Sequence, residues 1–152
     1  MQEDACITFR CPADEMDLVL LGRALVAAGE YQRAARMLRQ RDIFETSDMC
    51  CFLALYSLFM AGEKLKEQEA MESRDREDSV GKPRRNPFLS DLLEEVRQLL
   101  HRGHMDGFLW YIAGVIVRDA CRHGVREQDL GGLPSARDML MRAVTLYPCN
   151  WS

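Results

Sequence analysis

The stretch LVLLGRALVAAGEYQRAARML, residues 18–38, decides the fold of this chain. Its first half spaces apolar residues three and four apart, which predicts a helix over 14–28 with Leu18, Leu21 and Leu25 on its buried face. Gly29 interrupts the pattern, and residues 31–41 resume it with Ala34, Ala35 and Leu38. Because glycine ends helices at low steric cost, the stretch predicts an antiparallel helix pair that turns at Gly29.

Helical periodicity continues along the rest of the chain, and no strand alternation competes with it. We expect helices over 47–61, which Gly62 ends, over 64–72 after that turn, over 90–102 with Ser90 as N-cap, over 107–118 and over 135–147. Residues 73–87 combine charges with glycine and proline and are predicted to be a disordered or mobile loop. Residues 124–134 form a second irregular insertion. The chain is predicted to be all-α.

Gly29 and Gly62 lie 33 residues apart, close to the 34-residue period of tetratricopeptide repeats (TPRs). The pattern of the repeat recurs near the end of the chain, at Trp110, Ala113 and Gly114 and then at Ala136, Leu140, Ala143 and Pro148. We therefore expect a fragment of an α-solenoid, with an N-terminal extension at 1–13 and about three TPR-like units within 14–151. The units are 14–42, 47–102 with the charged loop 73–87, and 106–148 with the insertion 124–134.

Composition and motifs exclude several classes of function. The 152 residues hold 20 Lys plus Arg and 24 Asp plus Glu, so the net charge of −4 argues against a nucleic-acid partner. The longest apolar stretches are about half the ~20 residues that a membrane span needs. With no secretory signal, the six cysteines are interpreted as reduced thiols, Cys50 and Cys51 as small apolar helix residues.

The sequence also lacks the motifs that indicate a metal site or a catalytic nucleophile. The cysteine pairs Cys6–Cys11 and Cys50–Cys51 have no matching second pair of ligands at the spacing of a zinc site, and neither a G-x-S-x-G nor an H-E-x-x-H motif occurs. The acidic pair Glu94–Glu95 is predicted to lie on a solvated helix face. We expect no cofactor, no metal and no catalytic activity.

Four runs resemble one family among the TPR proteins: GEYQRAARML at 29–38, FLALYSLFMAGEKLKEQE at 52–69, DGFLWYIAGVIVR at 106–118 and AVTLYPCNW at 143–151. They resemble the N-terminal domain of the cell-division-cycle-twenty-three subunit of the anaphase-promoting complex. The resemblance implies a scaffold subunit of a cell-cycle ubiquitin ligase whose N-terminal repeats form a homodimer, with other subunits of that complex as further partners. It also implies a longer protein with further repeats. We expect the nucleus and the cytoplasm as its location.

The repeat register predicts which side chains line the concave groove, since the first helix of each TPR pair faces it. These are Met49, Phe52, Tyr56, Phe59 and Met60 in the second unit and Phe108, Tyr111 and Val115 in the third. Apolar positions of this kind favour a partner helix, although packing within the chain is the alternative. We expect the helix 14–28 of a second copy there, through Leu18, Val19, Leu21 and Leu25.

A second class of function is an independent TPR adaptor that binds a partner peptide or helix in the groove. A receptor for a terminal carboxylate needs a clamp of Lys, Arg and Asn side chains. The first repeat offers Val19 and Arg23 at those positions, and the second repeat is apolar there. The clamp is missing, which favours the homodimeric scaffold.

Overall fold

In the computed structural model, residues 13–39, 47–74, 84–103 and 105–148 are described, and they contain helices but no strand. The elements are α1 (Ala13–Ala27), α2 (Tyr31–Arg39), α3 (Asp48–Arg74), α4 (Leu89–Arg102), α5 (Gly107–Arg122), the 3₁₀ helix η2 (Glu127–Leu130) and α6 (Ala136–Leu146). The all-α prediction is confirmed. Among these helices, none has the length and apolarity to cross a membrane.

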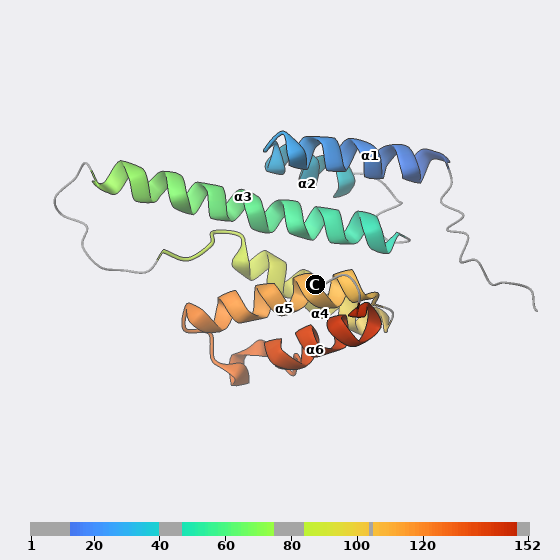
Figure 1. Ribbon diagram of the computed structural model, residues 1–152. Helices are drawn as coiled ribbons and strands as arrows, with labels where there is room; N and C mark the ends of the chain where they lie inside the picture. Colours follow the sequence, from blue (N-terminus) through green and yellow to red (C-terminus); the bar gives the residue numbers. More distant parts are fainter. Residues whose placement is uncertain (1–12, 40–46, 75–83, 104, 149–152) are drawn as a thin grey trace, which may run out of the picture.

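Each helix packs against its neighbours along the chain, and the closest packing is within the pairs α5–α6 and α2–α3 (Figure 1). Helices α1, α3 and α5 run side by side in the same direction, and α6 lies against α5 as α2 lies against α1 and α3. Small residues permit the close approach within pairs. A Cβ atom on Gly22 of α1 would lie 3.3 Å from the Leu38 side chain, and one on Gly114 of α5 would lie 2.8 Å from Leu140. This packing is consistent with a TPR-like solenoid fragment.

The turn predicted at Gly29 is confirmed. Gly29 has a φ of +75°, and the Glu30 N–H donates to the Leu25 carbonyl oxygen at 2.9 Å. That bond satisfies a carbonyl group left open by the end of α1. Gly103 ends α4 in the same left-handed conformation, as expected, with its N–H donating to the Leu100 oxygen.

The turn predicted at Gly62 is wrong, because α3 runs without a break from Asp48 to Arg74. Gly62 is needed for close approach rather than for a left-handed turn. A Cβ atom there would lie 1.9 Å from Asn86 Oδ1, far inside van der Waals contact. The Asn86 amide fills that space and is 1% exposed. Helix α3 therefore continues past the predicted end at residue 61, and Asn86 packs against the glycine in its middle.

Asn86 also sets the start of α4, which corrects the prediction of Ser90 as N-cap. The Asn86 Nδ2 group donates to the Phe59 carbonyl oxygen at 3.0 Å and to Glu63 Oε1 at 3.1 Å, while its Oδ1 accepts from the Phe88 N–H at 3.0 Å. The cap residue is Phe88, and Ser90 is exposed inside the helix. The predicted loop 73–87 is therefore packed at its described end, and its residues 75–83 lie outside the described residues.

The main core lies where α3, α4 and α5 meet. Its fully buried side chains include Leu55, Leu92 and Ile112, and Cys50 and Cys51 are buried free thiols as predicted. The insertion 124–134 contributes to this core through Leu130, which is 1% exposed at the end of η2. A stretch predicted as irregular thus contains a core residue, because one 3₁₀ turn carries a single leucine inward.

The prediction that Glu94 and Glu95 both lie on a solvated face is wrong for Glu95. Arg39 Nη2 at the end of α2 lies 2.5 Å from Glu95 Oε1 on α4. Burial raises the pKa of the Glu95 carboxyl, while the Arg39 guanidinium opposes that rise. The pair joins the first helix pair to α4, and only Glu94 is exposed.

Candidate protein-binding face

The eight predicted groove residues lie on α3 and α5, two helices that contact each other, and ring contacts bring Phe52, Tyr56 and Phe108 together. We call this set the aromatic face: Met49, Phe52, Tyr56, Phe59, Met60, Phe108, Tyr111 and Val115. Every member is half-buried. None is fully enclosed by its own chain and none stands fully in water, which is the burial expected of a surface that packs on one side only.

Ring contacts make the aromatic face continuous across two helices. The Phe52 and Tyr56 rings of α3 stack with centroids 6.0 Å apart, and the Phe52 and Phe108 centroids of neighbouring helices are 5.5 Å apart. Phe108 in turn lies 5.3 Å from the ring of Tyr147, at the end of α6. Offset and tilted pairs at such distances add about 0.5–1.5 kcal/mol each beyond area burial. The ring contacts therefore add to the packing between α3, α5 and the end of α6.

Tyr147 belongs to this row, and the sequence reasoning missed it as a site residue. A Cβ atom on Gly107 would lie 2.2 Å from Tyr147 Cδ2, so the glycine at the start of α5 makes room for the ring. In the sequence, Tyr147 stands at the end of the predicted helix over 135–147, directly before Pro148, and no local pattern there indicates a ring contact. Burial and the nearby Asp106 carboxylate raise the Tyr147 pKa.

The aromatic face is uncharged at neutral pH. Burial raises the pKa of the Tyr56 phenol, and the neighbouring phenols of Tyr31 and Tyr111 add to the rise. The same interactions show that Tyr31, at the start of α2, lies near this surface. A neutral surface of aromatic and methionine side chains is suited to apolar contacts with a protein rather than to acid–base chemistry.

Part of the aromatic face supports its own fold. Phe52, Tyr56 and Phe59 pack against the main core with one side of each ring, and Met49 packs against the smaller cluster between α1, α2 and α3. Packing within the chain, the alternative to a partner, therefore accounts for the buried half of these side chains. That a partner covers the other half stays a prediction.

The predicted dimer helix is α1, and its inward face is rotated from the prediction. Val19 is buried at 9% exposure against Leu38 and α3, whereas Leu21, predicted to be buried, is 49% exposed. Leu18 and Leu25 are half-buried. Val19 is thus a contact within its own chain. The outward apolar residues of α1 are instead Leu21 with two that the sequence reasoning did not single out, Met16 and Leu20.

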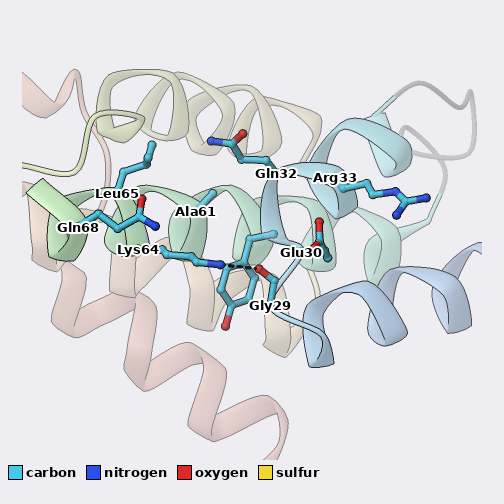
Figure 2. A pocket seen from close by; sticks show the side chains of 9 residues that line it. Gly29, Glu30, Gln32, Arg33, Ala61, Lys64, Leu65 and Gln68 are labelled. Carbon is cyan, nitrogen blue, oxygen red and sulfur yellow. Dashed lines mark hydrogen bonds between the residues drawn. The ribbon is translucent and has the colours of Figure 1, made fainter.

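A polar pocket of about 320 Å³ lies beside the aromatic face, between the turn after α1 and the middle of α3 (Figure 2). Lys64 crosses it, and its Nζ atom donates to the Gly29 carbonyl oxygen at 3.2 Å and lies 6.0 Å from the centroid of the Tyr31 ring. These contacts tie the end of α1 to α3. The pocket lining, residues 29–33 with Ala61, Lys64, Leu65 and Gln68, mixes charges and amides.

Metal ligands do not gather in the part of the chain that the structure describes: no group of three His, Cys, Asp or Glu side chains lies close enough to hold an ion. The described cysteines 50, 51 and 121 are free thiols. Burial raises the Cys51 pKa to about 12, so this thiol stays protonated at neutral pH.

Comparison with known proteins adds a family to this description. A family described as anaphase promoting complex subunit 8 / Cdc23 matches residues 1–152. Anaphase-promoting complex subunit 8 of Arabidopsis thaliana is 34% identical over 137 residues, covering 90% of this chain and 21% of that protein. The cell division cycle protein 23 homologs of Homo sapiens and Bos taurus are each 30% identical over 143 residues, covering 91% and 21%. The chain spans about a fifth of the length of these curated relatives.

Proposed function

The chain belongs to the anaphase-promoting complex subunit 8 / Cdc23 family, and from this premise we propose that it is part of a non-catalytic scaffold subunit of the anaphase-promoting complex. The observation that carries the proposal is the match of the family over residues 1–152. The relatives are named as subunits of that complex or as cell division cycle proteins. Stacked helix pairs support a scaffold role, because such arrays present extended surfaces to protein partners.

We further propose that the chain forms a homodimer through the aromatic face and α1. The aromatic face offers half-buried rings, and α1 offers an outward stripe in which Met16 is 47%, Leu20 53% and Leu21 49% exposed. Each surface forfeits about 25 cal/mol per Å² of apolar area that stays in water. In a two-fold dimer, α1 of each copy covers the aromatic face of the other, so that the same contact forms twice.

Substitution of an outward residue of α1 tests the homodimer without disturbing the core. We expect Leu21→Glu to convert the dimer to monomer in sedimentation velocity, because a carboxylate then enters an apolar contact on both sides of the axis. Met141→Glu is the matched control, since Met141 is 58% exposed on α6 and belongs to neither surface. A Leu21→Glu chain that stays dimeric with an unchanged dissociation constant contradicts the role of α1.

The aromatic face has its own test in the double substitution Tyr56→Glu with Phe59→Glu. We expect a soluble monomer whose far-ultraviolet circular dichroism still reports helix. Because both side chains also pack against the core, Tyr111→Glu is the second variant, and loss of the dimer in it separates association from stability. A dimer in both variants contradicts the proposed surface.

Membership of the complex is tested in cells. The affinity-tagged protein is expected to co-purify with other anaphase-promoting complex subunits and to be found in the nucleus and the cytoplasm by imaging. Recovery of the tagged protein without any other subunit contradicts the scaffold proposal. Loss of the dimer in Leu21→Glu with retained co-purification would assign the homodimer and the complex contacts to separate surfaces.

A further inference from the structure

The methionine side chains of this chain differ widely in their access to solvent. Met139 is completely buried, whereas Met16 is 47%, Met141 58% and Met71 66% exposed. Peroxides convert the thioether of methionine to a sulfoxide, and a reductase reverses the change. The thioethers of these three exposed side chains are therefore open to oxidation from solution.

Of the three exposed methionines, only Met16 belongs to a surface proposed to bind a second copy. Helix α1 packs on α2 and α3 and otherwise lies at the outer edge of the described fold (Figure 1). Met16 stands on the outward stripe of α1 with Leu20 and Leu21, which have no thioether. Met71, near the end of α3, and Met141, on α6, belong to neither proposed surface. Oxidation at one of the three sites is thus expected to affect association, and oxidation at the other two is not.

We propose that Met16 is an oxidation site and that its sulfoxide weakens the homodimer, so that association responds to hydrogen peroxide. The inference rests on the homodimer proposed above and adds a modification that regulates it. In the reaction the Met16 sulfur attacks one oxygen of the peroxide, an S–O bond forms and the O–O bond breaks. The other oxygen leaves as water with both hydrogens. The sulfur loses two electrons and the peroxide gains them, so no further reactant is needed.

The surface that Met16 would meet is suited to a thioether and unsuited to a sulfoxide. The aromatic face consists of aromatic and other apolar side chains, and it is uncharged at neutral pH because burial raises the Tyr56 pKa. A thioether gains from contact with aromatic rings. A sulfoxide is polar, and burial of a polar group against apolar side chains is costly. Because a two-fold dimer repeats the contact, we expect oxidation of both copies to raise the dissociation constant by about tenfold or more.

The exposure of Met16 should itself depend on association. In the proposed dimer the second copy covers Met16, whereas in the monomer the peroxide reaches it from solvent. In the wild type, the rate of Met16 oxidation should therefore fall as the protein concentration rises through the dissociation constant. The oxidation rates of Met71 and Met141 should stay constant over the same range. Mass spectrometry of peptides after a brief treatment with hydrogen peroxide measures all three rates in one sample.

Met16→Leu separates this thioether from the other methionines, since leucine keeps an apolar side chain of similar volume. Treatment at about pH 5 keeps the cysteines as unreactive thiols, and the chains are then returned to neutral pH. By sedimentation velocity we expect the dissociation constant to rise in the oxidised wild type and to stay unchanged in oxidised Met16→Leu. The double variant Met71→Leu with Met141→Leu is the matched control and should respond as the wild type does. Methionine sulfoxide reductase should restore the wild-type dimer.

The outcomes separate the inference from the function beneath it. A wild-type chain that is monomeric at every concentration before treatment overturns the homodimer and the inference with it. A dimer whose dissociation constant is unchanged once Met16 is oxidised overturns the inference alone. An equal weakening in oxidised Met16→Leu also overturns it, because another side chain then responds to the peroxide. If Met16→Leu itself fails to associate, the wild type still decides, since a Met16 oxidation rate that is constant with protein concentration contradicts the inference.

Discussion

Gly62→Ala is the substitution whose effect follows most directly from the packing of α3. In an exposed helix interior, exchange of glycine for alanine stabilises by about 1 kcal/mol. Here the new methyl group would lie 1.9 Å from Asn86 Oδ1 and 2.4 Å from its Cγ, so the amide must leave its site. Asn86 then loses its bonds to the Phe59 oxygen, Glu63 and the Phe88 N–H.

Three side-chain hydrogen bonds at about 1 kcal/mol each outweigh the gain in helix propensity. We expect Gly62→Ala to lower the free energy of unfolding by about 2 kcal/mol, which corresponds to a fall in Tm of about 4–8 °C for a chain of this size. Urea unfolding followed by circular dichroism measures the change, and the slope of the transition should stay constant.

The same substitution in an Asn86→Ala background is the control, and there its sign should reverse. With the amide removed, the Gly62→Ala methyl group enters free space and only the helix propensity remains, so we expect a gain of about 1 kcal/mol. Stabilisation by Gly62→Ala in the wild-type background would refute the reasoning. It would mean that Gly62 is an ordinary helix glycine and that Asn86 does not hold the start of α4.

Two further predictions concern Leu130 and the Arg39–Glu95 pair. Leu130→Ala should lower the free energy of unfolding by about 2–5 kcal/mol, because it leaves a cavity in the core. The control Met141→Ala, on the exposed face of α6, should change the free energy of unfolding by less than about 0.5 kcal/mol. Equal small effects of the two substitutions would contradict the assignment of the insertion to the core. Glu95 has a raised pKa in the folded state, so its contribution to stability is present below the unfolded pKa and is lost as the pH rises through the folded one. Urea unfolding between about pH 4 and about pH 7 should therefore show the wild type losing stability relative to Glu95→Gln as the pH rises, and the opposite slope would contradict it.

The helix pairs were predictable because their signals are local. Gly29 and Gly103 end helices in the left-handed conformation, and the apolar spacing on both sides of each predicts the helices they separate. Gly62 is a glycine for another reason, which is its contact with Asn86, 24 positions later in the chain. A local sequence pattern cannot reveal such a contact. Leu130 and Glu95 are similar cases. Only their neighbours in the fold show that Leu130 of a polar turn is buried and that Glu95, but not the adjacent Glu94, pairs with Arg39.

The candidate site was also predictable only in part. The repeat register predicted eight groove residues on two helices, and the structure joins three of them, Phe52, Tyr56 and Phe108, by ring contacts. It did not predict the rotation of α1, because the helix is apolar on nearly all sides and its sequence does not mark which side packs inward. Val19 and Leu21 exchange roles as a result. Tyr147 joins the site through Gly107, a contact between the two ends of a helix pair.

The mass of the chain in solution tests the central claim most directly. Light scattering coupled to size exclusion, over a range of micromolar concentrations, should give twice the 17.5 kDa of one chain, approaching the single-chain mass only on dilution. A constant mass of 17.5 kDa across that range would contradict the homodimer and leave the aromatic face and the outward stripe of α1 without the partner proposed here.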